Sequence, residues 1–187
     1  MPSSSHKKVI LRRFRPGGQT DILPGYLAVS GFVRNRALDL LDLSGRVVPI
    51  LLNDLKLISY VRDFNLNDTV NPERLTRRTF LARPRSEGLW LRLSFTSGDL
   101  LEGLAPTDHT LLDDLVNDAG LFLTPPDIRS NTQRIFVPRT SIAELTLLAV
   151  ITSPSKKKPG PLDPGTMTND QQQDLFSAEL PPNARPN

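Results

Sequence analysis

The sequence contains no cysteine, one tryptophan, two tyrosines and two histidines among its 187 residues. Without cysteine the chain can form no disulfide framework, no thiolate nucleophile and no cysteine-bound zinc site. The pair Asp108-His109 comes nearest to an acid–base couple, but adjacent residues of an extended chain point apart, and no motif links a serine to them. The sequence therefore predicts no catalytic residue, no metal site and no cofactor, and we expect a protein that is not an enzyme.

Long hydrophobic runs are also missing. The apolar stretch Val9–Leu11 stops at Arg12-Arg13, whereas a membrane span needs roughly 20 apolar residues and a signal peptide needs a longer apolar core. We therefore expect no membrane association and a cytoplasmic protein.

Charge of either sign is only slightly in excess, with 23 basic and 20 acidic residues and a net charge of +3. Such a small excess is weak evidence for an anionic partner. Arginine nevertheless gathers near the N-terminus and in the polar segment 65–87, and its planar guanidinium suits phosphate better than lysine does. The possible nucleic-acid contacts in these two groups are Arg12, Arg13, Arg74, Arg77, Arg78, Arg83 and Arg85.

Composition changes near residue 152. Prolines recur every few residues beyond this point and apolar residues nearly vanish, as in Lys156-Lys157-Lys158-Pro159-Gly160-Pro161. Such a segment cannot bury enough apolar surface to offset the entropy lost on ordering. The sequence predicts a disordered, proline-rich tail over 152–187.

Residues 1–151 contain an internal repeat. Val9–Phe14, the turn Gly17-Gly18 and Leu23–Leu27 match Leu89–Phe95, the turn Ser97-Gly98 and Leu101–Leu104. Both copies read as a strand that ends in phenylalanine, a tight turn and a strand that contains Leu-x-Gly. Glycine within a strand is typical of the sharp bend that closes a small barrel.

The later parts of the two copies also agree. In the first copy, Arg46-Val47-Val48-Pro49 precedes Leu55–Ile58, and in the second, Ile135–Pro138 precedes Ile142–Leu145. A proline is thus expected to end a β-branched strand shortly before the last strand of each copy. The segment 107–119 stays ambiguous, because its leucines fit a short acidic helix but a strand pair is also possible.

The sequence therefore predicts an all-β fold: two tandem small SH3- or Sm-like barrels related by internal duplication, followed by the disordered tail. The expected units are residues 1–64 and 88–151, joined by an arginine-rich linker over 65–87. Within the linker, Asn71-Pro72-Glu73 is typical of a helix start, whereas Thr79–Ala82 could form a strand.

The second copy resembles the Sm and Sm-like family of small five-stranded barrels. The resemblance lies in Gly98–Gly103, with Asp108 nearby, and in the apolar spacing of Val137–Leu145. It implies a five-stranded barrel and, through the family's arginine, an RNA contact at Arg139. The family's Arg-Gly pair is here Pro138-Arg139, which moves the arginine by one residue and so to the other side of a strand.

A polar loop follows Pro125-Pro126 and fits two interpretations: a binding loop, or an ordered turn whose side chains bond their own backbone. Its possible contact residues are Asp127, Arg129, Asn131 and Arg134. Because small barrels have exposed strand edges, we expect a non-enzymatic interaction or assembly module with a protein partner or self-association. The alternative is an RNA- or DNA-binding protein that uses the basic N-terminal strand and the linker.

Overall fold

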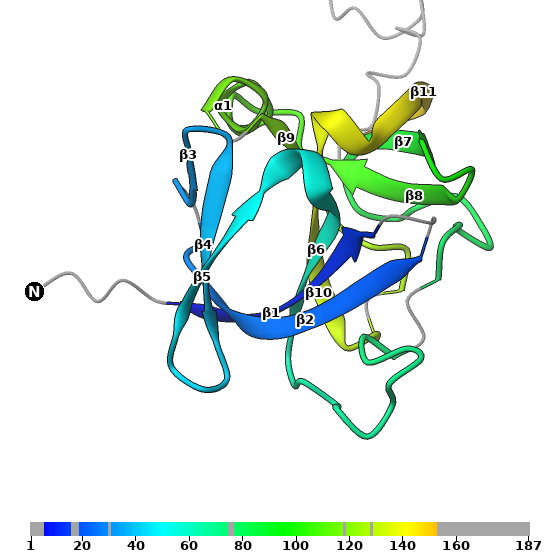
Figure 1. Ribbon diagram of the computed structural model, residues 1–187. Helices are drawn as coiled ribbons and strands as arrows, with labels where there is room; N and C mark the ends of the chain where they lie inside the picture. Colours follow the sequence, from blue (N-terminus) through cyan, green and yellow to red (C-terminus); the bar gives the residue numbers. More distant parts are fainter. Residues whose placement is uncertain are drawn as a thin grey trace, which may run out of the picture. The chain divides into compact units, whose positions relative to one another are not determined.

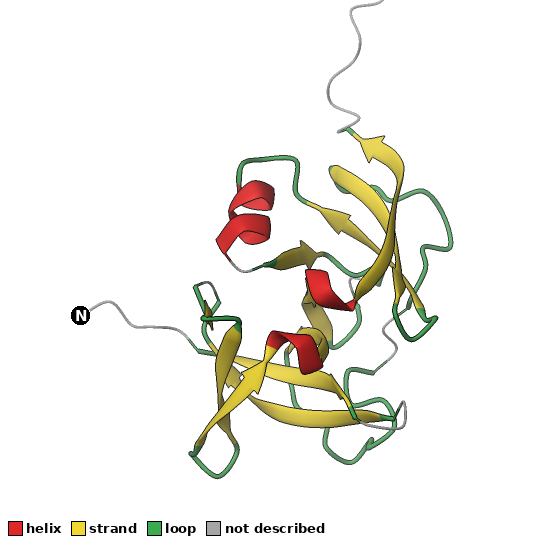
Figure 2. Ribbon diagram, turned by 45° about the horizontal axis from the view of Figure 1, so that its top comes forward, coloured by secondary structure: helices red, strands yellow, loops and turns green. Residues whose placement is uncertain are grey.

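The computed structural model describes residues 6–15, 19–29, 31–74, 77–117, 119–127 and 129–152. These ranges form mostly β-strands, with one α-helix and two 3-10 helices (Figures 1 and 2). The predicted all-β class is therefore confirmed. The predicted tail, apart from Thr152, and the predicted Gly17-Gly18 turn lie outside the described residues. No helix in the described ranges is long and apolar enough to cross a membrane.

The first unit is a curved antiparallel sheet in which β1 lies between β2 and β6, and β4 lies between β2 and β5 (Figure 1). Alternating residues of these strands point inward and form one apolar core, which includes Val9, Leu11 and Ile58, all fully buried. Its elements are β1 (Lys7–Phe14), β2 (Thr20–Leu27), β3 (Val33–Arg34), β4 (Ala37–Asp42), β5 (Val47–Leu51), the 3-10 helix η1 (Leu52–Asp54) and β6 (Leu55–Val61).

The second unit repeats the plan, with helix α1 at the place in the chain where the first unit has the short strand β3. The helix α1 settles the ambiguity over 107–119, and Asp108 stabilises its start by accepting hydrogen bonds from the backbone N–H and the hydroxyl of Thr110. The elements of this unit are β7 (Gly88–Phe95), β8 (Leu100–Ala105), α1 (Thr110–Asn117), β9 (Gly120–Leu123), β10 (Thr132–Pro138), the 3-10 helix η2 (Arg139–Ser141) and β11 (Ile142–Ile151).

The two units repeat the same order of neighbouring strands. The first runs β5-β4-β2-β1-β6, and the second runs β10-β9-β8-β7-β11, with β8 and β9 joined by the bridge between Leu104 and Thr124. Even an irregularity recurs: Lys56 in β6 and Ala143 in β11 have no partner in the strand register, and each is the second residue after a 3-10 helix. This agreement fits the predicted duplication. It also aligns β6 with β11 residue by residue, so that Ile58 corresponds to Leu145 and Tyr60 to Leu147.

The glycine of the Leu-x-Gly pattern has a similar role in both units. A Cβ on Gly25 would lie 2.6 Å from the carbonyl oxygen of Leu41, and one on Gly103 would lie 2.8 Å from the Cβ of Leu123. Both glycines let the second strand of a unit approach its neighbour closely.

A strand junction joins the two units. The last strand of the first unit, β6, pairs antiparallel with β10, which places Phe136 opposite Ile58. Phe136 and Phe122 thereby become buried members of the first unit's core, beside Phe32 and Tyr60. At the same junction η1 and η2 lie side by side (Figure 2), and the Thr140 hydroxyl donates a hydrogen bond of 3.1 Å to the carbonyl of Leu52.

The predicted alignment of the two prolines is wrong. The register pairs Ala37 with Leu51 and Gly120 with Pro138, and in both units a 3-10 helix follows at once. Pro138 is therefore the counterpart of Leu51, and Pro49 is the counterpart of Phe136. The prediction failed because it aligned residue types, whereas strand register is set by backbone pairing.

The linker forms no helix or strand within its described residues. The expected helix start at Asn71-Pro72-Glu73 is a single turn, closed by a hydrogen bond from the Arg74 N–H to the Asn71 carbonyl. Arg74 has a φ of 46°, which ends the helical path. The strand that Thr79–Ala82 could have formed is also absent. The Phe80 N–H donates to the Glu102 carboxylate instead of to a carbonyl of a neighbouring strand.

Candidate interaction site

Apart from the two-residue strand β3, two strands of the described structure, β5 and β11, have one edge without a paired neighbour. They stand at the two ends of the continuous strand order. Both carry exposed aliphatic side chains, which are uncommon on a solvated edge because they favour pairing with other chains. The exposed fractions are 63% for Val47 and 57% for Leu51 on β5, and 46% for Leu145, 53% for Leu147 and 53% for Val150 on β11.

The counterparts of the β11 residues are buried elsewhere in the same chain. Ile58 and Tyr60 of β6 are 0% and 5% exposed because β10 lies against that strand. Their counterparts on β11 are Leu145 and Leu147, equally apolar but about half exposed. The strand β11 therefore has the composition of a strand that is paired on both edges, yet among the described residues it is paired on one edge, with β7.

The backbone of β5 presents its free polar groups at the open edge. The Asp42 N–H donates to Arg46, and the Leu52 N–H donates to Arg36, so the even-numbered residues of β5 face β4. The backbone groups of Val47, Pro49 and Leu51 therefore face away from β4. Pro49 lacks an N–H, so this edge has one hydrogen-bond donor fewer than its length allows.

A hollow of about 290 Å³ lies beside β11. The counterparts of its lining residues in the first unit are at most 2% exposed and share a core with Phe136. In the first unit, therefore, side chains from a neighbouring strand help to fill the equivalent space. The hollow is lined by Leu121, Arg139, Ile142 and Leu145, whose counterparts are Leu38, Leu52, Leu55 and Ile58.

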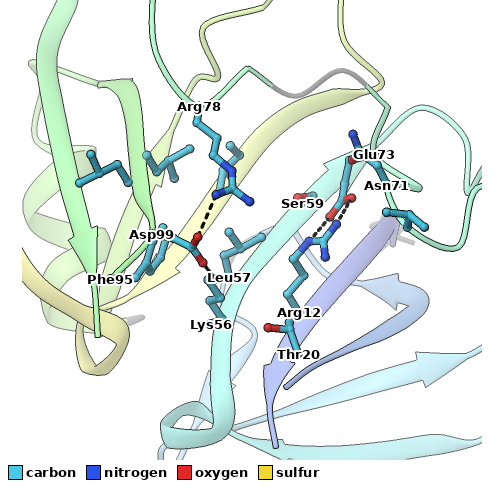
Figure 3. A pocket seen from close by; sticks show the side chains of 14 residues that line it. Arg12, Thr20, Lys56, Leu57, Ser59, Asn71, Glu73, Arg78, Phe95 and Asp99 are labelled. Atoms are coloured by element: carbon cyan, nitrogen blue, oxygen red, sulfur yellow. Dashed lines mark hydrogen bonds and ion pairs between the residues drawn. The ribbon is translucent and has the colours of Figure 1, made fainter. Parts of the chain in front are cut away.

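Four of the predicted nucleic-acid contacts are engaged in ion pairs, namely Arg12, Arg13, Arg77 and Arg78. Arg12 donates two hydrogen bonds, of 2.9 and 2.7 Å, to the buried carboxylate of Glu73. Arg13 shares Asp21 with Arg15. Arg12 lines a hollow of about 370 Å³ together with Arg78, and every charged group labelled there is drawn in an ion pair (Figure 3).

The other ion pair in that hollow centres on Asp99. Its carboxylate accepts hydrogen bonds from the buried Lys56 and, at 2.9 Å, from Arg78. The Lys56 ammonium is the main reason that the pKa of Asp99 is lowered from 3.8, and Arg78 adds to the effect. Lys56, Arg78 and Asp99 thus link β6 to the β7–β8 turn, and both cations already have a carboxylate partner.

The remaining linker arginines are exposed. Arg77 reaches Asp127 at 3.7 Å, whereas Arg83 and Arg85 line a hollow of about 260 Å³ with Pro125 and Pro126. Within the described ranges this lining contains no carboxylate. Two further candidates lie away from this group, because Arg74 sits in the exposed turn and Arg139 lies beside β11.

The predicted binding loop is an ordered turn whose polar groups bond mainly within the chain. Asp127 accepts the N–H of Arg129, and the Asn131 amide bonds to the backbone of Asp63 and Pro72. The Arg134 guanidinium lies 3.6 Å from the centre of the Phe122 ring. The Asp127 and Asn131 side chains are thus engaged within the chain, and the use of this loop for binding stays a prediction.

In a comparison with protein-family models, residues 5–149 match a family of unknown function (DUF6982). This range covers both units and most of the chain. The chain belongs to that family. Neither the curated proteins nor the solved structures contain a match. The resemblance to the Sm-like family stays a prediction, and the function has to be argued from the site.

The sequence predicts exposed strand edges without locating them. A usable signal was present in β11, where Leu145, Leu147 and Leu148 put apolar residues on both faces of the strand. A strand with apolar residues at successive positions is typically buried on both sides. The exposed run in β11 thus pointed to a missing neighbour.

Proposed function

We propose that this protein is a non-enzymatic interaction module that binds partners by adding a β-strand at the open edges of β5 and β11. The carrying observation is the contrast between β6 and β11. Equivalent apolar residues are buried by a neighbouring strand in the first case and about half exposed in the second. Strand addition supplies main-chain hydrogen bonds for affinity and side-chain pockets for specificity.

The chain itself offers the probe for this proposal. A peptide of residues 131–141 contains β10 and η2, which pair with β6 inside the protein. Since β11 is the counterpart of β6, the labelled peptide is expected to bind the open edge of β11. Fluorescence anisotropy measures the binding, and amide hydrogen exchange locates it through new protection of Leu145–Val150.

The matched control is the same peptide with Phe136→Lys, which removes the side chain that is fully buried at the internal junction. On the protein side, the double variant Leu145→Lys and Leu147→Lys should abolish binding of the unmodified peptide. Binding that survives this double variant, or no binding by the wild-type protein, would contradict strand addition at β11.

A second candidate function is binding of RNA or DNA, favoured by the hollow that Arg83 and Arg85 line and whose described lining contains no carboxylate. Guanidinium groups that lack an anionic partner are available to phosphate. This function predicts binding of a single-stranded oligonucleotide that weakens with salt and is lost in Arg83→Ser with Arg85→Ser. Arg13→Ser, which removes an arginine already held by Asp21, should retain most of the binding.

A further inference from the structure

We infer that the strand added at β11 is β5 of a second copy of this chain, in a head-to-tail contact that repeats the internal β6–β10 junction. The inference rests on the proposed function, because it names the partner of the same edges. The contact is heterologous, since a β5 edge on one copy meets a β11 edge on the next. Repetition of such a contact gives a ring if the rotation closes and a filament if it does not.

The order of strands supplies the first argument. Inside the chain, the strand at one end of the first unit, β6, pairs with the strand at the opposite end of the second unit, β10. The two strands left open are their counterparts, β11 and β5. Pairing of β11 with β5 of another copy therefore extends the strand order of the chain without any new kind of contact.

The register of the internal junction predicts the register between copies. Transferring the observed pairs of β10 with β6 to their counterparts places Val47 opposite Leu147 and Pro49 opposite Leu145. Aliphatic side chains thus meet across the contact and leave water together. The observed pairs that define this register are Arg134 with Tyr60, Ile135 with Ser59 and Phe136 with Ile58.

The hollow beside β11 supplies the third argument. Its counterpart in the first unit belongs to the core that contains Phe136, and the counterpart of Phe136 is Pro49 of the incoming strand. One polar contact transfers as well. Inside the chain, Thr140 donates a hydrogen bond to the Leu52 carbonyl. The counterparts of these two residues are Asn53 and Arg139. The exposed Asn53 amide of one copy would therefore donate to the Arg139 carbonyl of the next.

Pro49 limits the strength of this contact. The backbone of Pro49 faces the open edge, just as the backbone of its counterpart Phe136 faces β6. Because proline has no N–H, the contact between copies lacks one donor that the internal junction possesses. Proline on an edge strand is a common restraint on uncontrolled pairing. We therefore expect reversible association, with a mass that rises with concentration.

Complementary edge variants test the inference. Chain one contains Val47→Lys and Leu51→Lys, which block β5, and chain two contains Leu145→Lys and Leu147→Lys, which block β11. Each chain alone should stay monomeric by analytical ultracentrifugation, while the wild type should show a mass that rises with concentration. An equimolar mixture should form a dimer of one copy of each chain and nothing larger, because β11 of chain one and β5 of chain two remain intact.

Formation of that dimer also shows that both variants are folded. The matched control is Val70→Lys, which places the same charge on an aliphatic side chain that is 84% exposed and lies off both edges, and it should assemble like the wild type. A wild type that is monomeric at every concentration, or association that persists in chain one alone, would overturn the inference. A monomeric wild type that still binds the 131–141 peptide would overturn self-pairing alone and leave the proposed function intact.

Discussion

Pro49 and Phe136 occupy equivalent positions in the two units, yet Phe136 is fully buried against a neighbouring strand and Pro49 is exposed on an open edge. Restoring an N–H at this position should strengthen pairing at the β5 edge. We predict that Pro49→Val tightens self-association by about threefold to tenfold, the effect of about one net hydrogen bond. The dissociation constant from sedimentation equilibrium checks this value, and unchanged or weaker association would contradict the assigned orientation of Pro49.

Gly120 permits the close approach of β9 and β10. A Cβ at this position would lie 2.5 Å from the Phe136 ring, which is fixed in the first unit's core. We predict that Gly120→Ala lowers the free energy of unfolding by about 1–3 kcal/mol through overpacking. Urea denaturation measures the change, and Gln133→Ala, at an exposed position on β10, should leave it nearly unaltered.

The buried ion pair of Arg12 with Glu73 ties the linker to β1. The side chain of Glu73 is 3% exposed, so Glu73→Gln leaves the guanidinium without its anionic partner in a poorly solvated place. We predict a loss of about 1–3 kcal/mol in the free energy of unfolding. The comparison variant is Asp63→Asn at the exposed pair with Lys8, which should cost under about 0.5 kcal/mol. Equal effects of the two variants would argue against a structural role for Glu73.

Asp99 makes stability depend on acid pH. Its pKa in the folded protein is lowered, mainly because Lys56 donates a hydrogen bond to its ionised form. The stabilisation is therefore fully present above the unfolded-state pKa, near 3.8, and is lost as pH falls through the folded-state value. We predict that Asp99→Asn is destabilised at neutral pH and that its difference from the wild type shrinks in acid. Denaturant unfolding at a series of pH values checks this, and parallel curves for the two proteins would refute it.

The repeat could be predicted from sequence because its local signals are strong. Leu-x-Gly at Gly25 and Gly103 and strands ending before a short apolar segment recur in the same order. The alignment of Pro49 with Pro138 failed because one residue of register cannot be read from residue types alone. Local spacing allowed helix α1 but could not select it, since the strand alternative fitted the same leucines.

The candidate site was harder to predict because it depends on which strands lack neighbours. The apolar residues at Leu145, Leu147 and Leu148 signal burial, but no local feature shows that β6 pairs with β10 while β11 has no such neighbour among the described residues. The arginines show the same limit. Arg12 and Arg83 look alike in sequence, but a carboxylate 61 residues away binds the first. Contacts between residues far apart in the sequence therefore determine which strand edges stay open and which arginines have a carboxylate partner.

The junction between β6 and β10 has a consequence for cooperativity. The first unit's core is completed by Phe122 and Phe136, which come from the second unit. A fragment that ends in the linker would expose that core to water and lack the strand that covers β6. The duplicated halves are therefore interdependent, and residues 6–152 should melt in a single transition rather than in two.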